Sequence, residues 1–89
     1  MLKRGTQICY IPQFVTGSLK EKLAHRQTEF GFVETINNNG VWCRFWSHYS
    51  PNELRTKTNA EQTPPQCIIE YESHPQEQVD ELLETLTGR

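Results

Sequence analysis

Four aromatic or cationic side chains alternate along one stretch of the sequence. They are Trp42, Arg44, Trp46 and His48. In an extended strand, residues two apart project from the same face and lie about 7 Å from one another. Indole rings that flank a guanidinium group can stack on nucleic-acid bases or hold the apolar anchors of a peptide. These four residues, with Arg55 and Lys57 further along the chain, are therefore predicted to form a partner-binding surface.

The opposite face of the same stretch suits a hydrophobic interior, because it carries Val41, Cys43 and Phe45. Two interpretations of the aromatic face stay open. Either a helix from the same chain covers the two tryptophans, or they are exposed for a partner. A mixture of the two, with one tryptophan buried and the other exposed, is also consistent with the pattern.

A cysteine and a histidine close together can form a nucleophilic pair. However, Cys43 and His48 differ in strand parity, so their side chains point to opposite faces unless a bulge intervenes. The sequence also contains no glycine-rich phosphate loop. We therefore predict that the protein is not an enzyme.

Three cysteines and three histidines are scattered through the chain, at Cys9, His25, Cys43, His48, Cys67 and His74. There is no Cys-x-x-Cys motif, and a zinc site requires ligands at short spacing. The cysteines are expected to be small buried residues on strands. No metal site and no cofactor are predicted.

The length of 89 residues predicts one small domain covering positions 1–89. A formal net charge of −2 and a pI of about 5.9 give no basic excess for binding duplex nucleic acid. No apolar run approaches the roughly 18–20 residues of a membrane span, and the first residues do not resemble a signal peptide. The expected location is the cytosol, without membrane contact.

Period-two patterns and turn residues predict five short strands, at about residues 7–12, 30–36, 40–49, 55–58 and 67–71. In the first strand, Ile8 and Tyr10 are expected to face the interior. The run of residues 37–40, Asn-Asn-Asn-Gly, predicts a tight hairpin between the second and third strands. Gly31 predicts a bulge or bend in the second strand. Residues 55–66 are otherwise expected to form a loop.

Two helices are predicted. Ser18 and Glu21 have the spacing of a capping box, and Leu19 and Leu23 are expected to dock that helix on the body. A second helix is expected over about residues 75–87, ended by Gly88. Its apolar stripe consists of Val79, Leu82, Leu83 and Leu86. This stripe is predicted to pack on the sheet of its own chain or on a dimer partner.

The order of these elements resembles the small SH3-like barrels. The likeness lies in the opening Gly5-x-x-Ile8-x-Tyr10-x-Pro12 and in the strands that contain residues 30–33 and 41–45. The resemblance implies a mainly β fold: a partly open barrel of about five antiparallel strands with a C-terminal helix. Four runs, at residues 29–33, 43–46, 53–57 and 74–80, are similar to a group of short phage and prophage proteins of unassigned role. That likeness implies a phage-encoded accessory protein acting in the bacterial cytosol.

The expected function is non-enzymatic binding of a host macromolecule, most simply a host protein, by a monomer or a dimer formed through the C-terminal helix. A single-stranded nucleic-acid binder is the main alternative. Its phosphate contacts would come from Lys20, Lys22, Arg26, Arg55 and Lys57. A weaker alternative is an oligomer that sequesters a small nucleotide on the same surface.

Overall fold

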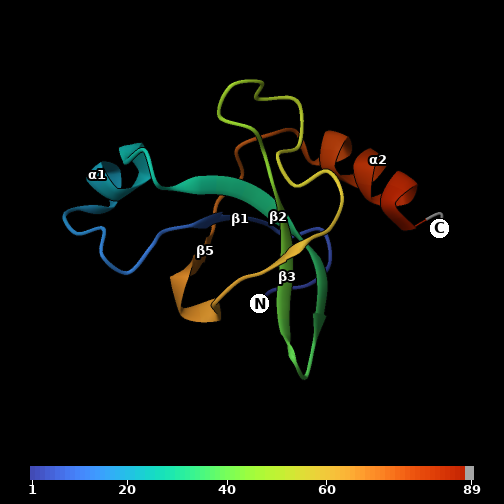
Figure 1. Cartoon of the computed structure of the whole chain (residues 1–89), viewed down its shortest axis with the longest axis horizontal. Helices are drawn as coiled ribbons and strands as arrows, with labels where there is room; N and C mark the ends of the chain where they lie inside the picture. Colours follow the sequence, from blue (N-terminus) through green and yellow to red (C-terminus); the bar gives the residue numbers. More distant parts are fainter. Residues whose placement is uncertain (88–89) are drawn as a thin grey trace.

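The computed structural model describes residues 1–87 and shows five antiparallel strands in one sheet, with a helix at each side (Figure 1). The elements are β1 (Gln7–Tyr10), α1 (Leu19–Ala24), β2 (Glu29–Asn37), β3 (Gly40–Phe45), β4 (Glu61–Gln62), a 3-10 turn (Pro65–Cys67), β5 (Ile68–Glu70) and α2 (Gln76–Thr87). The strand order is β4-β3-β2-β1-β5, so β5 returns to pair with β1. The prediction of a mainly β fold with a C-terminal helix is confirmed.

The hairpin between β2 and β3 forms where the asparagine run predicted it. Asn37 pairs with Gly40, and the Asn37 side-chain Oδ1 accepts a hydrogen bond of 2.7 Å from the Asn39 backbone N–H. Gly40 has a φ of 148°, which a residue without a Cβ adopts easily. Local turn chemistry therefore determines the register of the two longest strands.

The bulge predicted at Gly31 is wrong, because the register shift lies between Val33 and Thr35. Gly31 pairs regularly with Phe45. A Cβ atom on Gly31 would lie 1.9 Å from the carbonyl oxygen of Arg44. This glycine therefore permits a close approach of two backbones.

Both faces of the sheet are buried against apolar side chains. The inner-face cluster consists of Ile8, Val33, Val41, Cys43 and Phe45, with Leu2, Tyr10 and Ile68 packed against it. The outer-face cluster consists of Phe32, Trp46, Val79 and Leu83, with Phe30, Leu54, Leu82 and Leu86 packed against it. The inward placement of Ile8 and Tyr10 is confirmed. The apolar stripe of α2 packs on the sheet of its own chain, which is the first of the two predicted positions.

Several boundaries differ from those expected. No strand forms at residues 55–58; the short strand lies at Glu61–Gln62, and Leu54 forms an isolated bridge with Trp46. Helix α2 begins at Gln76, one residue after Pro75. Its predicted end at Gly88 lies outside the described residues. Within residues 1–87, neither helix combines the length and the apolar character needed to cross a lipid bilayer.

Candidate binding surface

Trp46 lies beneath α2 and is only 4% exposed. Its ring stacks on His74 with 4.0 Å between centroids and contacts Phe32 at 5.8 Å. Among the described residues, the indole Nε1–H has no acceptor. The expectation that this tryptophan faces a partner is wrong, because packing in the outer-face cluster uses both sides of its ring.

Arg44 is also buried, at 2% exposure. Its Nε donates to the Glu34 carboxylate at 2.6 Å, and its Nη1 donates to the Thr56 carbonyl oxygen at 2.6 Å. The Thr56 hydroxyl in turn accepts a hydrogen bond from the Phe45 backbone N–H at 3.0 Å. Arg44 therefore ties the loop after Leu54 to β2 and β3, and it is not free to contact a partner.

Trp42 is half-buried and lies in a shallow hollow on the same face. The hollow is lined by Glu34, Thr35, Asn37, Trp42, Asn59 and Ala60. Of the two tryptophans, one is thus buried and the other partly accessible, as in the mixed interpretation. A single indole edge offers much less stacking surface than the predicted row.

The three remaining predicted contact residues do not line the hollow at Trp42. His48 and Lys57 are exposed in the connection between β3 and β4. Arg55 lies over the Phe45 ring at 5.7 Å, on the inner face of the sheet. The six predicted residues therefore occupy both faces and do not form one surface.

Two carboxylates hold Arg55. Its Nε donates to Glu29 at 2.8 Å, and its two Nη atoms donate to the oxygens of Glu61 at 2.9 and 3.1 Å. The hydrogen bonds from Arg55 lower the pKa of the Glu61 carboxyl, and those to Glu61 and Glu29 raise the pKa of the guanidinium. A paired arginine of this kind presents little free charge to a ligand.

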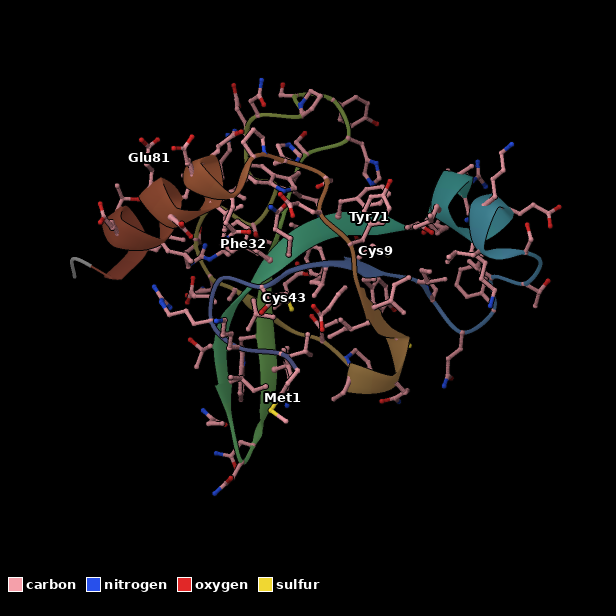
Figure 2. The ribbon with its side chains drawn as sticks, turned by 180° about the vertical axis from the view of Figure 1, so that it is seen from behind. Met1, Cys9, Phe32, Cys43, Tyr71 and Glu81 are labelled. Carbon is pink, nitrogen blue, oxygen red and sulfur yellow. The ribbon has the colours of Figure 1, made fainter. Side chains whose placement is uncertain are left out.

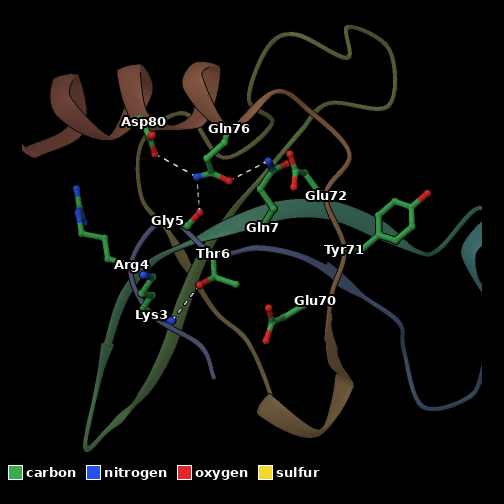
Figure 3. A pocket seen from close by; sticks show the side chains of 10 residues that line it. All are labelled: Lys3, Arg4, Gly5, Thr6, Gln7, Glu70, Tyr71, Glu72, Gln76 and Asp80. Atoms are coloured by element: carbon green, nitrogen blue, oxygen red, sulfur yellow. Dashed lines mark hydrogen bonds between the residues drawn. The ribbon is translucent and has the colours of Figure 1, made fainter.

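A polar hollow separates the N-terminal segment from the start of α2 (Figure 3). Gln76 Nε2 donates to the Gly5 carbonyl at 2.9 Å, and Gln7 Nε2 donates to Gln76 Oε1 at 3.1 Å and to the His74 carbonyl at 2.7 Å. Figure 3 shows these amides meeting at the upper edge of the hollow. The two glutamine side chains are hydrogen-bonded to each other and to backbone carbonyl groups. They therefore attach the start of α2 to β1 at the edge of this hollow.

A second surface lies on the excursion between β1 and β2, for which the sequence predicted a basic cluster but no exposed apolar group. No residue of α1 is buried. Leu19 is 57% exposed and Phe14 is 69% exposed, with the Phe14 ring edge-on to His25 at 6.2 Å. Docking of Leu19 on the body is therefore a wrong prediction. We call the group formed by exposed Phe14, Leu19, Lys20 and Arg26 together with half-buried His25 the α1 platform.

Short-range hydrogen bonds hold the α1 platform in shape. The Ser18 hydroxyl accepts from the Glu21 N–H at 3.2 Å, and the Glu21 carboxylate accepts from the Ser18 N–H at 2.8 Å, which confirms the capping box. These hydrogen bonds lower the pKa of the Glu21 carboxyl. Buried Val15 and Thr28 anchor the two ends of the excursion. The platform projects from the end of the sheet as a preformed unit (Figure 1).

The thiol groups are enclosed. Burial raises the pKa of the Cys9 and Cys43 thiols to about 11, and all three cysteines are buried. Figure 2 shows Cys9 and Cys43 inside the body of the protein. His48 lies on an exposed loop, so it does not meet Cys43. Among residues 1–87, no three His, Cys, Asp or Glu side chains are arranged to hold a metal ion.

Comparison of the chain with protein-family models, with curated proteins and with solved structures found no match.

Proposed function

We propose that this protein is a non-enzymatic binding module that attaches to a host protein through the α1 platform. In this proposal it is a phage-encoded accessory protein of the bacterial cytosol, with an SH3-like barrel as its framework. The strand order β4-β3-β2-β1-β5 and the 3-10 turn directly before β5 support that assignment of fold. Because such barrels serve many roles, the fold alone does not indicate the function, and the exposed surface carries the information.

The observation that supports this function best is the exposure of Phe14 and Leu19 on a segment fixed by its own hydrogen bonds. Burying an apolar side chain against a partner is favourable, and a preformed segment loses little conformational entropy when it binds. Lys20 and Arg26 are exposed on the same excursion and favour an acidic partner surface. Trp42, His48 and Lys57 keep accessible surface elsewhere on the protein.

Site-specific photo-crosslinking in bacterial lysate tests the proposal. A photoreactive phenylalanine analogue at position 14 is expected to give one defined protein adduct. The same analogue at position 36 is the control, because Ile36 is 42% exposed at the far hairpin. Unlabelled wild type should compete for the adduct, whereas the Leu19→Ser variant should compete poorly. Equal labelling from both positions, or no adduct from position 14, would overturn the proposal.

Single-stranded nucleic acid is the second candidate, because the platform combines an exposed phenylalanine ring with Lys20, Lys22 and Arg26. Fluorescence anisotropy with labelled oligonucleotides at low salt tests it. If this candidate is correct, the affinity should fall steeply as salt rises and should be lost in Phe14→Ser. Sequestration of a small nucleotide predicts instead a rise in thermal stability with mononucleotides.

A further inference from the structure

The two ends of this protein differ in net charge, with Glu21 on the basic α1 and with Arg4 donating to the Leu83 carbonyl of the acidic α2 at 3.2 Å. Three of the nine lysines and arginines lie within residues 20–26, on and after α1. Helix α2 has four acidic residues and no basic one within Gln76–Thr87. The acidic residues are Glu77, Asp80, Glu81 and Glu84, and all four are exposed. The two helices lie at opposite ends of a molecule that extends 40 Å (Figure 1).

An apolar strip lies between these two ends. Tyr71 is 40% exposed and Ile69 is 39% exposed, and the Tyr71 ring lies 5.4 Å from that of Phe30. Figure 2 shows Tyr71 between α1 and α2 on the side that faces the viewer. The face therefore has a basic end, a central aromatic and an acidic end.

We propose that a second copy of this chain binds across this face in an antiparallel, two-fold symmetric dimer. Helix α1 of each copy lies against α2 of the other, and Tyr71 and Ile69 of both copies meet near the symmetry axis. In a two-fold symmetric dimer every contact occurs twice. Each basic α1 end therefore meets an acidic α2, and the dimer is closed. The half-buried Leu82 on the flank of α2 is an apolar neighbour for the Phe14 ring of the partner copy.

Charge complementarity selects a second copy over a nucleic acid. A polyanion is attracted to α1, but it is repelled by the four carboxylates of α2 and by the net charge of −2. A second copy offers an acidic helix to each α1 and a basic segment to each α2. The contacts are exposed, so the dimer is expected to be weak, with a Kd of about 0.1–1 mM. This inference does not depend on the proposed host partner.

Sedimentation velocity across a concentration series tests the dimer. At about 20 mM NaCl the wild type should sediment as a monomer–dimer mixture. Near 500 mM NaCl the Kd should rise at least about tenfold, because the Debye length there is only about 4 Å. Wild type that stays monomeric at low salt, or a dimer that salt does not affect, would overturn the inference. Assemblies larger than a dimer would exclude the closed two-fold arrangement.

Two charge-reversal variants give the sharper test. Lys20→Glu/Arg26→Glu makes the α1 end acidic, and Glu77→Lys/Glu81→Lys/Glu84→Lys makes α2 basic, because only Asp80 then remains acidic on that helix. Each variant alone should be monomeric, because like charges then face each other. A one-to-one mixture should restore the dimer, since both contacts become complementary again. A mixture that stays monomeric would contradict the inference.

Exposed charges elsewhere supply the control. Lys57→Glu changes the net charge by the same amount as each single charge reversal, but position 57 lies outside the proposed interface. This variant should therefore leave the dimer unchanged. Circular dichroism confirms that each variant is folded. If Glu77→Lys/Glu81→Lys/Glu84→Lys is unfolded, the uncharged replacement Glu77→Gln/Glu81→Gln/Glu84→Gln is used instead, and it should weaken the wild-type dimer without adding positive charge to α2.

Discussion

The ring of His74 lies parallel to that of Trp46, with an angle of 15° between their planes. Its two nitrogens are both engaged: Nε2 faces the Pro51 carbonyl oxygen at 2.6 Å and Nδ1 faces the Ser73 hydroxyl at 2.8 Å. The imidazole thus joins the loop after β3 to the segment before α2. Because the ring lies against Trp46, this indole stabilises the position of α2 on the sheet.

Replacing Trp46 is therefore expected to weaken the fold. Trp46→Ala should lower the free energy of unfolding by about 3–5 kcal/mol, the usual cost of emptying a core site of this size. His48→Ala is the matched control on the same predicted strand, and it should change stability by less than about 0.5 kcal/mol because the side chain is exposed. Urea unfolding measures both values, and equal stabilities would contradict the core role.

The ion pair between Arg55 and Glu61 makes a pH-dependent contribution. The folded-state pKa of Glu61 lies below the ordinary 4.5, so the contribution is present above that pH and is lost as the pH falls through the lowered value. Glu61→Gln should cost less than about 1 kcal/mol at pH 7, since the side chain is half exposed. In urea titrations, the difference from wild type should vanish in strong acid. A difference that persists there would exclude the carboxylate as its cause.

At the scale of single elements, α1 is held by its cap and not by tertiary packing. Ser18→Ala should destabilise this helix locally by about 1 kcal/mol. Hydrogen exchange should then speed up at the α1 amides and stay unchanged in β2 and β3. Thr16→Ala, at an exposed position before the cap, should leave α1 unaffected. Loss of protection throughout the sheet would show that α1 and the sheet unfold together.

The pairing of β2 with β3 requires glycine at position 31. Gly31→Ala should cost about 3 kcal/mol or more, because its Cβ would meet the Arg44 carbonyl oxygen on the neighbouring strand. Gly40→Ala should cost less, about 1 kcal/mol, since the new Cβ meets the movable end of Gln62. Thermal unfolding ranks the two variants. A milder effect at position 31 would mean that the strands can separate at little cost.

For the whole molecule, burial of the thiols predicts a loss of stability at high pH. The pKa of Cys9 and Cys43 is about 11 in the folded state against an ordinary 9.0. Above pH 9 the unfolded chain releases these protons more readily, so the free energy of unfolding should fall between about pH 9 and 11. Cys43→Ala should reduce this slope, as measured by urea titrations at several pH values.

Labelling with a thiol reagent gives an independent check. Because all three cysteines are buried, the reagent should modify them at the rate of opening of the fold, not at the rate of a free thiolate. Fast modification of one cysteine at neutral pH would show that its cover opens locally.

The sequence predicted the features that depend on neighbouring residues. The asparagine turn, the capping box at Ser18 and the apolar stripe of α2 are local patterns with a direct structural consequence. Strand β4 has only two residues and no pattern, so its pairing depends on where the long loop returns to β3. Such short pairings follow from the tertiary structure and cannot be read from periodicity.

The candidate site was less predictable for the same reason. Trp42 and Trp46 share strand parity, and only the position of α2 decides that Trp46 is covered while Trp42 is not. The spacing of Leu19 and Leu23 predicted docking, yet a helix of six residues can satisfy its backbone through its cap and remain off the sheet. The exposure of Phe14 follows from that position of α1.

The excursion between β1 and β2 departs from and rejoins the sheet at one cross-strand pair, Tyr10 with Glu29. The pairing of β1 with β2 therefore does not depend on the length of this segment or on the residues at its tip. Insertions or deletions around residues 16–25 are expected to change this excursion while the register of β1 with β2 stays the same.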